Sequence, residues 1–274
     1  MEKGVVWVIG ASSGLGLATA AAFAEKGWRV IAGARSFTAE APASTDGIQR
    51  LPLDVTDATS VEAFTGRALS LSPHVDALVY CAGLLVLGSC EETATGEYQR
   101  VMETNFIGMT RMVSAALPTM RTQGKGRIIL FSSINGLLGI PFQSAYTASK
   151  HAIEGYAECL RMETKPYGIT VSLVEPGDHR SGSQAYRLRA EREHTDSPYA
   201  AEYASACAII HRDESGGLGP QKLGRKVERL ASGSRRFRRR VAKPDQRLAV
   251  AIHRLLPASV GFGILRSYYI KKGR

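Results

Sequence analysis

Apolar runs of strand length alternate along the chain with stretches whose apolar residues recur at helical spacing. The alternation spans the first 175 residues. It predicts an α/β protein with a doubly wound parallel sheet of about seven strands joined by crossover helices. Predicted strands cover residues 4–9, 28–35, 48–53, 76–83, 127–132 and 168–175, and predicted helices cover 17–26, 97–123 and 145–167.

A glycine turn follows the first predicted strand. Gly10, Gly14 and Gly16 have the spacing Gly-x-x-x-Gly-x-Gly and precede an Ala-rich helix. Glycines at such a place allow a tight turn and let backbone N–H groups approach a pyrophosphate at the helix N-terminus. The order strand, glycines, helix favours dinucleotide binding over the alternative, a tight turn without a ligand.

The end of the second strand bears on the choice of dinucleotide. An NAD site usually presents an acidic residue here to bind the ribose 2′-hydroxyl. In this chain Gly33 and Ala34 hold that place, and Arg35 follows. An Arg suits a 2′-phosphate, and Ser12 in the glycine turn offers a further hydroxyl. We therefore expect NADP(H) rather than NAD(H); the alternative is a surface Arg at a strand end.

Polar residues follow two further strands or interrupt a helix. Asp54 is a candidate partner for an adenine amino group, and Asp57 is a candidate cap for the next helix. The fourth strand ends in small residues at 81–83, where a cofactor can pass close to the backbone. Asn105 interrupts the apolar face of a predicted helix and needs partners if buried. These partners are either neighbouring backbone groups or a water in a proton relay.

The segment 133–150 carries the candidate chemistry. Tyr146 and Lys150 are four residues apart, so on a helix they share one face. An ammonium beside a phenol favours the phenolate, so we expect the pKa of Tyr146 to fall below its usual value of about 10. Such a Tyr can transfer a proton near neutral pH. Ser133 follows an apolar strand and is expected at the strand's carboxyl end, where open α/β sheets bind ligands.

Composition narrows the protein class. The chain has 274 residues, of which 44% are hydrophobic, which is ordinary for one large globular domain. No apolar run approaches the length of a membrane span, and a strand starting at Gly4 leaves no room for a signal peptide. The four cysteines lack metal-ligand spacing and are expected to be reduced, so we expect no metal and a cytoplasmic location.

Taken together, these motifs resemble the short-chain dehydrogenase/reductase family, and its steroid/retinoid-type, 17-beta-hydroxysteroid dehydrogenase-like reductases in particular. The resemblance covers residues 4–181. It implies a single-domain Rossmann fold and reversible hydride transfer between NADP(H) and an alcohol/carbonyl pair. The matching motifs are Gly10–Gly16, Asp54, Ala82-Gly83, Asn105, Ser133, Tyr146-x-x-x-Lys150 and Pro176-Gly177.

The resemblance also implies roles for single residues. Tyr146 is the expected general acid of reduction, and Lys150 lowers its pKa and binds the nicotinamide ribose. Ser133 is expected to hydrogen-bond the carbonyl oxygen, and Asn105 to hold the water that links Lys150 to solvent. The expected cofactor-binding residues are Gly10, Ser12, Ser13, Gly14, Leu15, Gly16, Arg35, Asp54, Val55, Cys81, Ala82, Gly83, Tyr146, Lys150, Pro176, Gly177, His179 and Ser181.

The chain departs from the family pattern at three places. Ile9 stands where Thr is usual, and Cys81 where a second Asn precedes Ala-Gly. The segment 178–181, Asp-His-Arg-Ser, follows Pro-Gly where an apolar residue and then Thr are usual; Ser181 can replace that Thr. None of these changes touches the Tyr, Lys, Ser and Asn set, so a catalytically competent enzyme is expected.

Residues 182–274 are expected to form the substrate lid, an edge strand and a basic tail in the same domain as the core, residues 1–181. The lid is expected to contain a charged helix over 184–193, a second helix from Ser197, and a Gly-rich loop over 215–220. The run 235–241, Arg-Arg-Phe-Arg-Arg-Arg-Val, resembles the basic strand that closes the sheet in steroid/retinoid-type reductases. There Phe237 and Val241 are expected on the buried face, and Arg236, Arg238 and Arg240 in solvent.

Charge is uneven along the chain, with 14 Lys/Arg against 17 Asp/Glu in residues 1–178 and 21 against 8 in residues 179–274. A nucleic-acid patch is disfavoured, because only Phe237 interleaves with the arginines. The tail over 245–272 combines apolar and basic residues, so it either packs on the lid or lies on an anionic membrane.

The expected substrate is a hydrophobic alcohol or ketone, such as a steroid, a retinoid or a lipid-like carbonyl. The alternatives are a 3-ketoacyl or 3-ketosphingoid reductase and, in another class, a non-catalytic NADP-binding redox regulator. By resemblance, a homodimer or homotetramer is expected. Candidate pocket residues are Leu84, Leu85, Leu137, Leu138, Ile140, Pro141 and Phe142.

Overall fold

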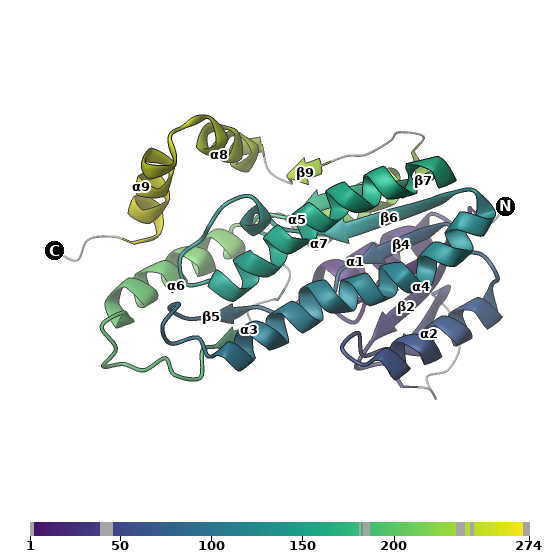
Figure 1. The fold of residues 1–274 in the computed structure, drawn as a ribbon, viewed down its shortest axis with the longest axis horizontal. Coiled ribbons are helices and arrows are strands. Elements are labelled where there is room, and N and C mark those ends of the chain that lie inside the picture. The colour runs from purple at the N-terminus through teal and green to yellow at the C-terminus, as the bar shows by residue number, and fades with distance from the viewer. Residues whose placement is uncertain are drawn as a thin grey trace.

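The computed structural model describes residues 3–38, 46–180, 182, 187–233, 239–241 and 244–270. A seven-stranded parallel sheet with the order β3-β2-β1-β4-β6-β7-β9 forms its centre, and helices cover both faces (Figure 1). This confirms the predicted Rossmann-type fold. The strands are β1 Val5–Ile9, β2 Arg29–Ala34, β3 Ile48–Pro52, β4 Ala77–Tyr80, β5 Val86–Leu87, β6 Gly126–Phe131, β7 Ile169–Glu175, β8 Leu188–Arg189 and β9 Arg239–Val241.

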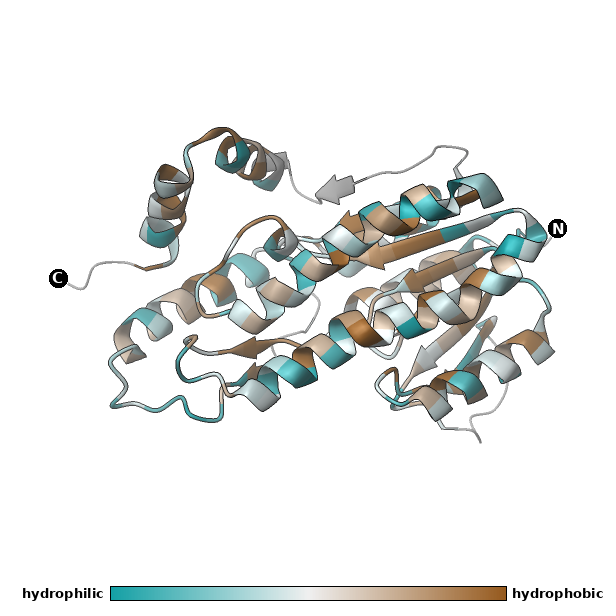
Figure 2. Ribbon diagram, in the orientation of Figure 1, coloured by the Kyte–Doolittle hydropathy of each residue, from teal (hydrophilic) through white to brown (hydrophobic). Residues whose placement is uncertain are grey.

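The helices lie in two layers. Apolar side chains of α2, α4 and α5 pack on one face of the sheet, against Trp7 and Ile9 of β1. Those of α1 and α7 pack on the other, against Val6 and Val8, as the two-residue period of a strand requires. Figure 2 shows the buried strands as apolar. The helices are α1 Gly14–Glu25, α2 Ala58–Leu71, α3 Thr95–Met102, α4 Gly108–Gln123, α5 Ser144–Thr164, α6 Ala200–Ser215, α7 Pro220–Ser232, α8 Pro244–Leu255 and α9 Ala258–Tyr269.

The predicted helix over 97–123 is interrupted. A π turn, Glu103–Ile107, separates α3 from α4, and Asn105 lies inside it. Such turns insert an extra residue into an α-helix and occur frequently at functional sites. The helix that follows β6 begins near its predicted start, and Asp57 caps α2 by accepting a hydrogen bond from the Thr59 N–H, as predicted.

The lid, which we define as residues 187–233, differs from its prediction. The charged helix expected over 184–193 is wrong for the described residues 187–193, because Leu188–Arg189 pair as β8 with Val86–Leu87 of β5. Helix α6 was expected, but α7 was not. Helix α7 packs along α1, with the backbone of Ala18 directly against Gly224, where a side chain would clash.

The tail, which we define as the described residues 239–241 and 244–270, closes the sheet as predicted: β9 pairs in parallel with β7. Helix α9 contacts α6 through an ion pair between Arg266 and Glu202 at 2.8 Å. The predictions for Arg236, Phe237 and Arg238 lie outside the described residues, as do those for the side chains of Arg240 and Val241. Within the described chain, no helix has the length and apolar character that a membrane crossing requires.

Candidate active site

The glycine turn lies where β1 meets α1. Gly10 has φ +83° and Gly14 has φ +54°, conformations that favour glycine. A Cβ on Gly10 would lie 2.5 Å from the N atom of Ala82. The Ser13 side chain makes no capping hydrogen bond in the described chain, which leaves the first N–H groups of α1 open toward the turn. The backbone geometry therefore fits the pyrophosphate of a dinucleotide.

Arg35 lies exposed at the end of β2. A Cβ on Gly33 would lie 2.6 Å from the Leu53 side chain and 2.9 Å from that of Phe64, so a carboxylate at that position would require these side chains to move. Asp54 follows β3 and accepts hydrogen bonds from the N–H and hydroxyl of Thr56 at 2.9 and 2.8 Å. Burial alone would raise the pKa of Asp54, but these bonds and the nearby Arg35 charge lower it. An ionised Asp54 beside Arg35 suits the adenosine end of a cofactor. The next residue, Val55, is buried.

Tyr146 and Lys150 stand on the first turns of α5, as predicted. The Lys150 Nζ lies 5.3 Å from the centre of the Tyr146 ring and donates to the Phe131 carbonyl at 2.8 Å. Burial lowers the pKa of Lys150 to about 8 and raises that of Tyr146 to about 12, against a hydrogen bond with Ser133 that lowers it. The pKa of Tyr146 is thus raised and not lowered in the protein by itself, because desolvation outweighs the hydrogen bond with Ser133.

Asn105 and Lys150 meet at Gly83. A Cβ on Gly83 would lie 3.6 Å from the Asn105 Oδ1 and 3.9 Å from the Lys150 Nζ. Asn105 accepts from the Leu84 N–H at 2.6 Å and donates to the Leu84 carbonyl and the Ser149 hydroxyl at 2.9 and 2.8 Å. Both amide hydrogens are therefore engaged by the protein. We call Gly83, Asn105, Ser133, Tyr146 and Lys150 the catalytic floor.

Sequence reasoning missed Asn135. Its Oδ1 accepts the Ser133 hydroxyl at 3.2 Å, and its Nδ2 donates to Gln143 at 3.0 Å and Thr147 at 3.2 Å. The only signal was a polar residue two positions after Ser133, within a short apolar segment. Asn135 links the end of β6 to the start of α5 and so positions Ser133 relative to Tyr146.

The Pro176-Gly177 turn follows β7 and meets both the lid and the tail. His179 is buried, and its Nδ1 lies 2.9 Å from the Gly177 carbonyl. Gln246 of α8 donates to Asp178 at 2.5 Å and lies directly against Gly177, where a Cβ would clash. On the other side of the floor, burial raises the pKa of the Cys81 thiol. Ser181 lies outside the described residues.

An apolar cluster borders the floor. It includes the predicted pocket residues Leu85, Leu137, Ile140 and Phe142, whereas Leu84 packs in a separate cluster. Its other members come from β5, the segment after β6, α6 and α9: Leu87, Ile134, Tyr203, Cys207, Ile210 and Tyr269. Because Ile134 follows Ser133 directly in the chain, we call this cluster the apolar wall beside the floor; the lid and the tail both contribute to it.

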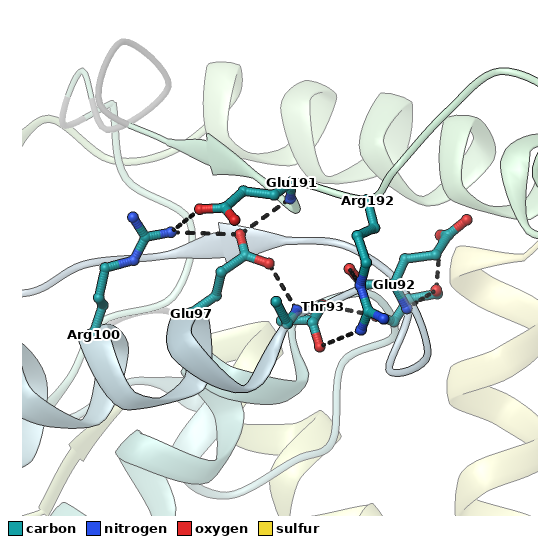
Figure 3. Close-up of polar contacts among 8 residues, drawn as sticks. Glu92, Thr93, Glu97, Arg100, Glu191 and Arg192 are labelled. Atoms are coloured by element: carbon teal, nitrogen blue, oxygen red, sulfur yellow. Dashed lines mark hydrogen bonds and ion pairs between the residues drawn. The ribbon is translucent and has the colours of Figure 1, made fainter.

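Charged side chains anchor the first part of the lid (Figure 3). Arg192 donates to the carbonyls of Glu91 at 2.8 Å and Glu92 at 3.4 Å. The Glu191 N–H donates to the buried Glu97 at 3.2 Å, and Arg100 pairs with Glu191 at 2.8 Å. These contacts hold residues 187–193 against α3 and the segment before it.

A family model for short chain dehydrogenases matches residues 4–192. A 3-ketodihydrosphingosine reductase from Bacteroides thetaiotaomicron is 35% identical over 271 residues, covering 98% of this chain and 99% of that protein. Human 17-beta-hydroxysteroid dehydrogenase type 1 is 37% identical over 189 residues, covering 65% of this chain and 57% of the human protein.

Solved structures agree in fold. A short-chain dehydrogenase from Streptomyces avermitilis has a TM-score of 0.80 at 30% identity, covering 95% of both chains. A Burkholderia phymatum short-chain dehydrogenase/reductase in complex with NAD has a TM-score of 0.79 at 25% identity, covering 92% of this chain and 93% of that one. A Thermococcus sibiricus alcohol dehydrogenase complexed with 5-hydroxy-NADP has a TM-score of 0.71 at 24% identity, covering 86% and 94%. The chain therefore belongs to the short-chain dehydrogenases, a family of oxidoreductases.

Proposed function

We propose that this protein catalyses NADPH-dependent reduction of a ketone on a lipid-like substrate, the reverse oxidation being the same chemistry. The observation that carries the proposal is the catalytic floor beside an apolar wall. Lys150 and Asn105 face Gly83, and Ser133 bonds Tyr146 on the side of the apolar cluster. The intact set of polar groups disfavours the alternative of a non-catalytic redox regulator.

Bound NADPH supplies the hydride. Tyr146 donates its phenolic proton to the substrate oxygen, and its raised pKa keeps that proton in place until the oxygen gains negative charge. Ser133 turns its hydroxyl from Asn135 toward the same oxygen and stabilises the developing charge. Lys150, fixed to the Phe131 carbonyl, would offer its remaining N–H groups to the ribose hydroxyls of the cofactor and, in its charged form, would favour proton release from Tyr146.

NADP(H) preference is part of this proposal, supported by Arg35 at the end of β2 and by the close packing of Leu53 and Phe64 on Gly33, where an NAD site usually has an acidic residue. Arg35→Ala is expected to raise KM for NADPH by about tenfold to a hundredfold, since a charge-assisted contact to the 2′-phosphate is lost. KM for NADH should change little. Equal effects on both cofactors, or a wild type that prefers NADH, would contradict the assignment of Arg35.

Two relatives suggest substrate classes. The match to the 3-ketodihydrosphingosine reductase spans nearly the whole of both chains, lid and tail included, whereas the match to the steroid dehydrogenase covers 65% of this chain. Because the lid forms the substrate wall, the first match favours a long-chain sphingoid-type ketone, and a steroid or retinoid ketone is the second candidate.

The deciding experiment follows NADPH oxidation by the full chain over a panel of ketones: a ketosphingoid, steroid ketones, retinal, a β-ketoacyl thioester and a small quinone. We expect turnover on the ketosphingoid and loss of about a hundredfold to ten-thousandfold in Tyr146→Phe, which removes the proton donor. NADPH binding without turnover on any ketone would reject the proposal in favour of the regulator.

The tail supports a proposal of peripheral membrane contact by a cytoplasmic protein. Exposed apolar side chains of α8 and α9 accompany Arg254 and Arg266, a combination suited to an anionic lipid surface. Flotation with anionic vesicles should be lost in Leu255→Asp/Phe262→Asp; absence of flotation of the wild type would contradict the contact. The exposed apolar residues are Leu248, Ile252, Leu255, Val260, Phe262 and Ile264.

Self-association is a separate proposal. The family resemblance implies that α4 and α5 form the contact face of a homodimer or homotetramer. Met162 near the end of α5 is 69% exposed, so a substitution there tests this face without disturbing the core. Light scattering of the wild type should give a mass above one chain, and Met162→Glu should lower the association constant.

A further inference from the structure

An ion pair lies at the end of the otherwise apolar inner face of α6. Tyr203, Cys207 and Ile210 follow one another at helical spacing and belong to the apolar cluster of the substrate wall. Glu214 stands one turn further along the same face. Its carboxylate pairs with Arg187, which comes from the segment before β8, and the two side chains are 17% and 10% exposed.

This pair is poorly explained as a stabilising contact. Two charges lose much of their hydration when buried together, and apolar residues of similar volume would serve stability as well or better. Arg187 also keeps a buried Nε–H without an acceptor among the described residues. A buried donor left in this way is costly unless something else satisfies it. The pair therefore points to a ligand that brings an acceptor.

The pair lies within electrostatic reach of Tyr146. Burial is the largest cause of the raised pKa of that phenol, Glu214 raises it further, and Arg187 lowers it. Tyr269 of α9 covers the same corner from the tail, and its pKa is raised by burial and by the carboxylates of Asp178, Asp213 and Glu214. The cations nearby, Arg189 and Arg212, pair with Glu193 and Asp213.

The charges around Glu214 and Arg187 favour a positively charged ligand over a negatively charged one. An arriving ammonium would share the Glu214 carboxylate, which can accept several hydrogen bonds, and would meet a corner rich in carboxylates. An arriving anion would compete with Glu214 for Arg187 and face Asp178 and Asp213. A hydroxyl oxygen on the same ligand would satisfy the free Arg187 Nε–H, and an alkyl chain would lie along the apolar cluster.

We propose that Glu214 and Arg187 form a substrate subsite for the amino and hydroxyl groups of a long-chain 2-amino-1-hydroxy-3-ketone, Glu214 taking the ammonium and Arg187 the hydroxyl. This proposal rests on the proposed ketone reduction and names the group beside the reacting carbon that the enzyme selects. The residues from which the subsite is built come from two lid segments, so the lid and not the sheet sets this specificity.

Binding tests the subsite independently of turnover. The probes are a long-chain 2-amino-1-alkanol, which has no reacting group, and its N-acetyl derivative, which has no charge; both are titrated calorimetrically into the full chain with NADPH. We expect the amine to bind about tenfold to a hundredfold more tightly, as for a hydrogen bond to a charged group. Glu214→Gln should abolish that preference. Glu202→Gln, on the same helix but in the outer ion pair with Arg266, should retain it.

Equal binding of the two probes by the wild type, or a preference that survives in Glu214→Gln, would overturn the subsite. If Glu214→Gln does not fold, because Arg187 is left buried and unpaired, the double variant Arg187→Met/Glu214→Gln removes both charges and carries the same expectation. NADPH oxidation with the 2-amino ketone then tests the reaction: an amine preference without turnover on any ketone rejects the proposed function and leaves the subsite standing.

Discussion

The catalytic floor and the lid are held by different kinds of contact. On the floor, polar side chains are fixed by backbone groups at the ends of parallel strands: Lys150 by the Phe131 carbonyl, and Asn105 by both backbone groups of Leu84. In the lid, charged side chains add to the backbone pairing of β8 with β5, as between Arg187 and Glu214 or from Arg192 to the segment before α3. Backbone anchors tolerate little change, whereas charged anchors can be exchanged one by one. The floor should therefore set the reaction, and the lid the substrate.

The largest effect is expected from Asn105→Leu on the floor. The change leaves the Leu84 N–H and carbonyl without their Asn105 partner and removes one donor to the Ser149 hydroxyl, which still donates to the Tyr146 carbonyl. Unfolding free energy should fall by roughly 2–4 kcal/mol, and kcat should fall by about a hundredfold or more as Gly83 and Lys150 lose their relative positions. Denaturant unfolding and NADPH oxidation measure the two effects.

Asn105→Asp is a second variant: it preserves the acceptor for the Leu84 N–H but turns a carboxylate oxygen toward the Leu84 carbonyl. Because Asn105 is fully buried, the unfolding free energy of this variant should fall as well. An Asn105→Leu variant as stable and active as the wild type would show that the π turn needs no such anchor.

This contrast also explains what the sequence could predict. Strand ends and the glycine turn follow from local patterns, so Gly10, Ser133, Tyr146 and Lys150 were placed correctly. The π turn was not predicted, because the apolar spacing of Val101 and Met109 on either side fits an uninterrupted helix. Asn135 was missed because its role depends on Gln143 and Thr147, which approach only in the folded chain.

Two predictions were wrong, the low pKa of Tyr146 and the helix in residues 187–193, and both depend on burial or on contacts that form only in the folded chain. The pKa of Tyr146 depends on how far the folded chain excludes water, and the spacing of Lys150 on a helix says nothing about that. Residues 187–193 carry mostly charged side chains without apolar spacing, so their partners, Leu87 in β5 and Glu97 in α3, could not be inferred from the lid itself.

The next prediction concerns the pH dependence of ketone reduction, which should depend on a residue of the floor and not on the lid. Lys150 is a cation below its pKa of about 8 and loses that charge as the pH rises through this value. Tyr146, with a pKa of about 12, stays protonated over the same range. The kcat/KM of ketone reduction should therefore be constant below about pH 7, fall to about half at pH 8 and to about a tenth at pH 9.

Glu214→Gln should leave this midpoint in place, because burial is the main cause of the lowered pKa of Lys150. Rates measured across pH 6–10 with NADPH in excess provide the test. A rate that does not change up to pH 9 would show that the reaction does not require the charged form of Lys150.

A smaller effect is expected where the tail meets the Pro176-Gly177 turn. A methyl group at Gly177 would displace Gln246, which lies against it and bonds Asp178. Gly177→Ala should release the start of α8 from the Pro176-Gly177 turn and raise KM for the ketone severalfold. Gly263→Ala in α9 is the control, since a Cβ there meets no atom of the described chain within 4 Å. Equal KM and kcat values for the two variants would show that the contact between the tail and Gly177 does not affect the active site.

The smallest effect should come from the outer anchor of the lid. Arg192→Gln removes donors to the carbonyls of Glu91 and Glu92 and should lower the unfolding free energy by about 1 kcal/mol, the worth of an ordinary hydrogen bond. Arg100→Gln should cost less, because its pair with Glu191 is exposed, at 52% and 63% of the two side chains. If the lid sets the substrate and not the reaction, Arg192→Gln should raise KM for a long-chain amino ketone severalfold while kcat for a small ketone stays unchanged. A fall in kcat for both ketones would mean instead that loosening residues 187–193 disturbs the Tyr146 environment, and that floor and lid act as one unit.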